Sequence, residues 1–113
     1  MKLKESETIE LKKSLAKLKE GLISVFAILN KHGVGFLWFG ISPLGKILGL
    51  DVTEKTLRNI SQSIAAHIEP KIYPHITTET IDNRNCIKIT FSGKEFPYFV
   101  YGKVYMQVAD RWD

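Results

Sequence analysis

Acidic and basic side chains crowd the start of this chain. Glu5, Glu7 and Glu10 stand close together, and Lys12 and Lys13 follow them directly. Carboxylates that converge can hold a divalent cation such as Mg²⁺, which prefers oxygen ligands and phosphate partners. A neighbouring ammonium, here that of Lys12, would then stabilise negative charge developing on a phosphate. The cluster therefore raises the hypothesis of a nuclease site.

A simpler explanation of the same acids competes with this hypothesis. If a helix begins near residue 13, Glu7 and Glu10 lie near its positive end, where carboxylates are stabilising. We prefer this explanation because no further acid stands nearby in the sequence. We accordingly expect no catalytic residue, no metal site and no cofactor in this domain, with Glu5 and Glu10 kept as the enzymatic alternative.

Lysines form the second set with chemical meaning. Residues 12–34 contain five lysines and a single acid, Glu20. Apolar residues recur every three or four positions from 13 to 32, which predicts an amphipathic helix. At about 100° per residue, Lys13, Lys17 and Lys31 fall nearly opposite its apolar stripe. Such repeated cations suit a polyanion, because each phosphate contact releases condensed counterions. Alternatively, the lysines are only the solvated side of the helix.

Further cations extend this candidate surface beyond the first helix. The residues proposed to contact nucleic acid are Lys12, Lys13, Lys17, Lys31, Lys46 and Arg58. Phosphate contacts carry no sequence information, and the chain has only three arginines, Arg58, Arg84 and Arg111, to read base edges. We therefore expect weak, salt-sensitive binding with little sequence preference.

Other reactive side chains give no pattern that indicates a site. His32, His67 and His75 are scattered, and their spacing with the single Cys86 does not predict a zinc site. Cys86 falls in an alternating apolar run, which predicts a buried and inert thiol. Three tyrosines near the C-terminal end offer possible stacking surfaces for unpaired bases: Tyr98, Tyr101 and Tyr105.

Length and composition limit the class of protein. At 113 residues the chain makes one domain, and 44% hydrophobic with 25% charged residues is ordinary for a globular fold. The net charge of +4 permits an anionic partner without requiring one. One cysteine cannot form an internal disulfide, and the sequence shows no secretory signal or membrane-spanning run. We expect a cytoplasmic protein with no membrane partner.

The first half of the chain predicts a strand, two helices and a buried hairpin. Residues 8–11 alternate as a short edge strand, and the helix over 13–32 ends at Gly33. The nearly continuous apolar run 35–41 predicts a strand that is buried on both faces, and 47–50 returns after a turn at 42–45 as its hairpin partner. A second helix begins after Thr53 as N-cap and ends before Pro70. Its inward residues are predicted to be Leu57, Ile60, Ile64 and Ala65.

The second half of the chain predicts only strands. Residues 73–81 and 86–91 alternate on either side of a turn at 82–85, and 97–101 and 104–108 flank a tight turn at Gly102-Lys103. The order of these elements predicts an α+β domain, in which two helices pack on a largely antiparallel β-sheet.

Short segments spread along most of the chain match one known family. They are ESETIELKKS (5–14), LNKHG (29–33), FGI (39–41), GKILG (45–49), TLRNIS (56–61), IEPKIYP (68–74), PY (97–98) and YMQVAD (105–110). In this order and spacing they resemble the Schlafen/AlbA-type domain in its bacterial and archaeal form. The resemblance implies an AlbA-like α+β fold and a DNA-binding domain of transcriptional regulators or helicase-related proteins.

Two departures from the family pattern bear on activity. The turn after Phe39-Gly40-Ile41 usually carries polar or acidic residues, and here it holds Ser42, Pro43 and Leu44. Gln107 stands where the family usually has an arginine. Some eukaryotic Schlafen relatives cut RNA with three acids, of which two match Glu5 and Glu10 while the third falls in this turn. The resemblance therefore implies the binding form without a complete nuclease site.

These observations lead to one hypothesis and two alternatives. The chain is a single Schlafen/AlbA-type domain over 1–113, the N-terminal part of a longer protein with further domains, and a possible homodimer. It binds nucleic acid, with DNA preferred, as a module of a transcriptional regulator. The alternatives are a metal-dependent endoribonuclease that uses Glu5 and Glu10, and a protein-interaction domain without nucleic-acid contact.

Overall fold

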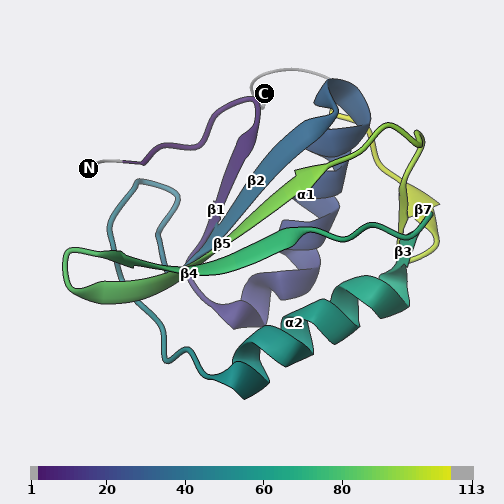
Figure 1. Cartoon of the computed structure of the whole chain (residues 1–113). Coiled ribbons are helices and arrows are strands. Elements are labelled where there is room, and N and C mark those ends of the chain that lie inside the picture. Colours follow the sequence, from purple (N-terminus) through teal and green to yellow (C-terminus); the bar gives the residue numbers. More distant parts are fainter. Residues whose placement is uncertain (1–2, 108–113) are drawn as a thin grey trace.

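The computed structural model describes residues 3–107 (Figure 1). Its elements, in chain order, are β1 (Ile9–Lys12), a 3-10 turn (Leu15–Lys17), α1 (Leu18–His32), β2 (Val34–Phe39), α2 (Glu54–His67), β3 (Ile68–Glu69), β4 (His75–Ile81), β5 (Arg84–Ser92), β6 (Phe99–Val100) and β7 (Lys103–Val104). Two α-helices combine with mainly antiparallel strands, so the predicted α+β class is confirmed.

The strands form two sheets. The larger sheet has the order β1-β2-β5-β4, and only the β1–β2 pair is parallel. Parallel neighbours need a crossover, and α1 supplies it between β1 and β2. The smaller sheet, β3-β6-β7, is antiparallel throughout and lies beyond the C-terminal end of α2 in Figure 1. The sequence did not indicate this second sheet.

Both helices cover the same face of the larger sheet. The side chains of Val25 and Ile28 lie so close to Gly35 that an added Cβ there would approach Val25 Cγ2 to 2.9 Å. Residues of α1, β2, β5 and α2 join in one core, in which Leu37 is fully buried and Ile60 of α2 almost so. Figure 1 shows α1 running alongside the sheet and α2 crossing near the start of α1.

The opposite face of the sheet is covered only in part. A second, smaller cluster gathers Leu11, Trp38, Ile41 and Cys86 there, with Ile47 of the following loop packed against them. Both faces of β2 are therefore apolar, as its sequence predicted. The predicted hairpin partner 47–50 is wrong: Ile47 makes a single bridge to Ile41, and the Gly40 carbonyl then accepts from both Leu48 and Gly49. This curls the chain away from strand geometry.

Helix α1 starts later than predicted. Lys12 is still paired with Phe39 in the sheet, which requires extended backbone at that position. Ser14 is also extended (φ −152°, ψ 168°), and a single 3-10 turn precedes Leu18. Lys13 is consequently outside any helix. The predicted C-terminal stop is confirmed, because Gly33 takes a left-handed φ of 78° and donates to the Leu29 carbonyl.

Helix α2 starts as predicted and ends at His67, three residues before Pro70. The Thr53 hydroxyl accepts from the backbone N–H of Thr56, whose own hydroxyl accepts from the N–H of Thr53, which completes a capping box. Ile60 and Ile64 are buried, but Ala65 is exposed, because it lies about 100° further round the helix. After His67 the chain enters β3, whose pairing with β6 ends the helix before Pro70.

Tight turns close the later hairpins. Asp82 and Asn83 have φ values of 51° and 61°, the pattern of a two-residue type I′ turn. Strand β4 ends at Ile81 as predicted, whereas β5 begins at Arg84, inside the predicted four-residue turn. The β6–β7 turn falls at Tyr101 and Gly102, one residue earlier than predicted. Strand β7 ends at Val104, and Val108, the predicted end of this strand, lies outside the described residues.

Candidate functional site

The structure brings Glu5 and Glu10 together at one edge of the larger sheet. Glu10 lies on β1, and Glu5 lies in the segment before it, where its carboxylate accepts a hydrogen bond from the Leu11 N–H at 3.1 Å. A cavity of about 250 Å³ separates this segment from α1 and the C-terminal stretch near Gln107. Its polar lining is Glu5, Ser6, Glu10, Ser24 and Gln107.

The environment of Glu10 is unusual for a carboxylate. Burial raises its pKa, the neighbouring Glu5 carboxylate raises it further, and Lys12 lowers it, with the result that the pKa of Glu10 stands at about 7. Lys12 Nζ lies 3.4 Å from Glu10 Oε2, and the two side chains are 19% and 20% exposed. Two carboxyl groups and one ammonium therefore meet in a partly desolvated pocket, where Glu10 can both take up and release a proton near neutral pH.

This placement corrects the simpler explanation of the acids. Glu10 belongs to β1, and α1 begins only at Leu18, so Glu10 is not at a helix start. The carboxylates nevertheless fall short of a metal site. Within residues 3–107 no three Asp, Glu, His or Cys side chains are grouped so that they could hold a metal ion. Ser42 and Pro43 occupy the turn that corresponds to the third acid of the RNA-cutting relatives, and a donor set of two carboxylates does not fit a metal-dependent nuclease.

The predicted basic surface is divided among several elements. Lys12 points into the carboxylate pocket, whereas Lys13 is exposed just after β1. Lys17 is exposed in the 3-10 turn, with Nζ 3.6 Å from Glu20 Oε1. Lys31 is exposed near the other end of α1, roughly 20 Å away at 1.5 Å per residue.

The remaining two candidate cations lie apart from α1. Lys46 is exposed in the loop that packs on the opposite face of the sheet, and Arg58 is exposed on α2. The six residues therefore do not make one continuous patch. Five of them are nevertheless exposed to solvent: Lys13, Lys17, Lys31, Lys46 and Arg58.

The tyrosines predicted as stacking surfaces are largely used inside the protein. Tyr98 is only 2% exposed, and Tyr101 stacks on His67 with ring centroids 4.4 Å apart. Lys19 Nζ also lies 5.0 Å from the Tyr101 ring. Tyr105 is partly buried, and its carbonyl accepts from Asn30. Tyrosine stacking of bases is therefore not supported at these positions.

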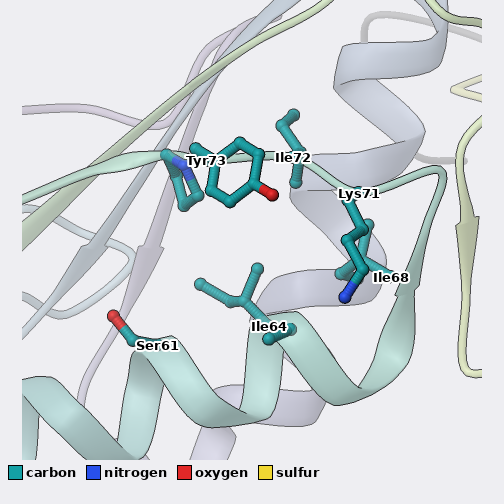
Figure 2. A pocket seen from close by; sticks show the side chains of 8 residues that line it. Ser61, Ile64, Ile68, Lys71, Ile72 and Tyr73 are labelled. Carbon is teal, nitrogen blue, oxygen red and sulfur yellow. The ribbon is translucent and has the colours of Figure 1, made fainter.

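A second cavity lies between α2 and the segment that follows β3. It has a volume of about 300 Å³, and Ile64, Ile68 and Ile72 provide its apolar walls. Figure 2 shows the Lys71 ammonium near Ile68 and the Tyr73 ring standing over the gap. Tyr73 is 88% exposed, so this wall is open to solvent. No sequence pattern indicated this cavity, because its two sides meet only in the folded chain.

Lys88 is a further cation that the sequence did not single out. Its Nζ lies 5.4 Å from the centroid of the Phe36 ring and 5.5 Å from that of Trp38. Alternation in β5 places Lys88 opposite the buried Ile87 and Ile89, but only the pairing register reveals the two rings beneath it.

Comparison with known proteins identifies the family. The model of the family described as "Schlafen, AlbA_2" matches residues 5–111, and the chain belongs to this family. Comparison with curated proteins gives no match. No helix within residues 3–107 combines the length and the apolar character needed to span a membrane.

A solved structure supports the same fold. It is the N-terminal domain of "Putative ATP-dependent DNA Helicase RecG-related Protein" from Nitrosomonas europaea, which aligns with a TM-score of 0.67 at 18% sequence identity. The alignment covers 98% of this chain and 84% of the other. At this identity the likeness establishes the α+β architecture, as the sequence predicted.

Proposed function

We propose that this domain binds nucleic acid through phosphate contacts and that it is a module of a transcriptional regulator. Of the two nucleic acids, we favour DNA as the partner. The observation that carries the proposal is the exposure of five of the six candidate cations in a member of the Schlafen AlbA_2 family. The net charge of +4 favours an anionic partner. The name of the structural neighbour, a RecG-related DNA helicase, agrees with DNA as that partner.

The two ion pairs, Lys12–Glu10 and Lys17–Glu20, differ in how far they keep these lysines from a phosphate. Lys17 and Glu20 form an exposed pair, and such pairs contribute about 0 to 1 kcal/mol, so a phosphate can replace Glu20 readily. Lys12 is half-buried against Glu10 and is the weakest member of the proposed set. Lys13 and Lys17 are the nearest neighbours in sequence among the exposed members, and the test is aimed at them.

The test is titration of a labelled DNA duplex with wild-type protein and with the double variant Lys13→Glu plus Lys17→Glu. We expect wild-type affinity to fall roughly 10- to 100-fold between 50 and 200 mM salt, as for a few phosphate contacts, and the double variant to lose binding. The matched control is Lys94→Glu plus Lys103→Glu, which changes two exposed lysines outside the set by the same charge. Equal loss in both double variants would show that net charge alone matters. Salt-independent or absent binding by the wild type would favour a protein-interaction domain.

RNA cleavage centred on Glu5 and Glu10 is the second candidate function. The observation that favours it is the convergence of Glu5, Glu10 and Lys12, with the pKa of Glu10 at about 7. Its test is incubation of RNA with the protein, with and without manganese. If the wild type cleaves RNA and the Glu10→Ala variant does not, the function of the domain is RNA cleavage and not binding alone.

We also propose that the domain works as a homodimer and is the N-terminal part of a longer, cytoplasmic protein. A few separated cations give more affinity when two copies of the domain engage one duplex, because the second contact becomes intramolecular. Light scattering with and without duplex measures the stoichiometry. A persistent complex of one protein per long duplex would contradict the dimer.

A further inference from the structure

The face of the larger sheet that is turned away from α1 has an uncovered end. The loop after β2 packs over Trp38 and Cys86 and leaves the other end of the strands open. Five of the side chains that alternation places at this open end make up what we call the polar sheet face: Phe36, His75, Thr77, Lys88 and Thr90. His75 is exposed and the other four are partly exposed.

Strand pairing draws these side chains into a compact group. Thr90 is paired with Phe36 on one side and with His75 on the other, and Lys88 is paired with Thr77. Directly opposed residues on neighbouring strands have Cβ atoms about 5 Å apart. Two hydroxyls, one imidazole and one ammonium are therefore held on the adjacent strands β4 and β5, with the Phe36 ring beside them on β2, within reach of a single extended ligand.

Lys88 is fixed in place without being neutralised. Its ammonium lies over the rings of Phe36 and Trp38, an arrangement that holds a cation by the negative faces of the rings. Within residues 3–107 no carboxylate lies in ion-pair distance of Lys88. On this face of β4 and β5, alternation places one acid, Glu79, and two basic residues, Lys88 and Arg84. The face therefore favours an anion.

The other polar side chains of the face also lack partners. In the part of the chain that the structure describes, neither the hydroxyls of Thr77 and Thr90 nor the ring of His75 makes a side-chain hydrogen bond. Each of these groups can donate a hydrogen bond to an oxygen of a ligand. A pre-positioned cation flanked by donors is the arrangement that phosphate oxygens select.

We propose that the polar sheet face binds a single strand of nucleic acid. Lys88 contacts a phosphate, Thr77, Thr90 and His75 donate to phosphate or sugar oxygens, and the partly exposed Phe36 ring supplies apolar surface for an unpaired base. Unpaired bases stack on aromatic side chains of open sheets, whereas bases in a duplex are already stacked. This inference rests on the proposed nucleic-acid binding and adds to it a surface that includes none of the six candidate cations.

The experiment measures anisotropy of a labelled 12-nucleotide oligo(U) with unlabelled duplex as competitor. We expect Lys88→Gln to weaken oligo(U) binding roughly tenfold at 50 mM salt and to reduce the salt dependence by about one phosphate contact. Lys88→Arg, which keeps the cation over the rings, should restore most of the affinity. The matched control Lys103→Gln removes the same charge from the smaller sheet and should change affinity less than twofold.

A second variant distinguishes a loss of binding from a loss of folding. Thr77→Val plus Thr90→Val preserves shape and removes only hydroxyls, and it should weaken oligo(U) binding several-fold with an unchanged circular dichroism spectrum. In the wild type, added oligo(U) should shift the backbone amide signals of Phe36, Lys88 and His75. If the wild type binds oligo(U) and these variants bind equally well, the polar sheet face is not the site. If the wild type binds neither oligo(U) nor duplex, the proposed function fails as well.

Discussion

The protonation of Glu10 is linked to folding. Burial and the Glu5 carboxylate raise the pKa of Glu10 from 4.5 to about 7, against the opposing effect of Lys12. Between these two values the folded protein keeps a proton that the unfolded chain has released. The free energy of unfolding must therefore fall as the pH rises from about 4.5 to about 7, and this loss is complete above pH 7.

Substitution Glu10→Gln tests this linkage. The amide has nearly the shape of the protonated acid and cannot ionise, so the variant avoids the penalty of an ionised Glu10 beside Glu5. We expect the variant to exceed the wild type in stability by on the order of 1 kcal/mol at pH 8, after a discount for solvent screening, and to match it at pH 5. Urea unfolding at both pH values measures the difference.

Glu20→Gln is the control for this prediction. Glu20 is exposed on the first turn of α1 and pairs only with the exposed Lys17. Its substitution should leave the difference from wild type nearly equal at pH 5 and pH 8. A Glu10→Gln variant that shows the same flat behaviour would mean that Glu10 is solvated and titrates normally.

At the level of elements, α1 is tied to the C-terminal segment by one buried polar side chain. Asn30 Nδ2 donates to the carbonyls of Tyr98 (3.0 Å) and Tyr105 (2.8 Å), and its Oδ1 accepts from the Tyr98 N–H at 2.7 Å. Asn30 is only 8% exposed. Tyr98 and Tyr105 flank the β6–β7 hairpin, so the Asn30 amide satisfies backbone groups on both sides of this hairpin and holds it against α1.

Asn30→Asp should therefore destabilise the fold strongly. The carboxylate keeps the size of the amide but loses both N–H donors and faces two carbonyl oxygens in a buried site. We expect a loss of about 3 kcal/mol in the free energy of unfolding at pH 7. Asn59→Asp, an exposed substitution on α2, should cost less than about 0.5 kcal/mol. Equal effects in the two variants would show that Asn30 is not a structural tie.

Elements with a local cause could be predicted from the sequence. Gly33 ends α1 because only its own backbone must turn left-handed, and Thr53 caps α2 through a residue three positions away. Features set by distant partners could not be predicted from the sequence. The late start of α1 follows from the pairing of Lys12 with Phe39, and β3 exists only because it pairs with β6.

In the candidate sites, too, local features could be predicted and features that depend on distant residues could not. Sequence proximity pointed to Glu5, Glu10 and Lys12, and the structure brings their side chains together. The raised pKa of Glu10 was not predictable, because it depends on burial against α1. Lys88 was missed because nothing near it in the sequence reveals the rings of Phe36 and Trp38, which lie on another strand.

For the whole molecule, the larger sheet separates two polar surfaces. Glu10 is paired with Leu37, whose side chain faces the helices, whereas Lys88 is paired with Trp38, the next residue of β2. Successive residues of a strand point to opposite faces, so the carboxylate pocket and the polar sheet face lie on opposite sides. The two surfaces share no side-chain partner within residues 3–107.

This separation predicts how substitutions combine. The effects of Glu10→Gln and Lys88→Gln on the free energy of unfolding at pH 8 should add to within about 0.5 kcal/mol, because the sites share no contact. Glu5→Gln and Glu10→Gln should not add, since either one relieves the repulsion between the same two carboxylates. We expect the second gain to be smaller than the first by on the order of 1 kcal/mol. Urea unfolding of both double-mutant cycles measures these couplings. Coupling between Glu10 and Lys88 as large as that between the two acids would mean that the sheet transmits changes from one face to the other.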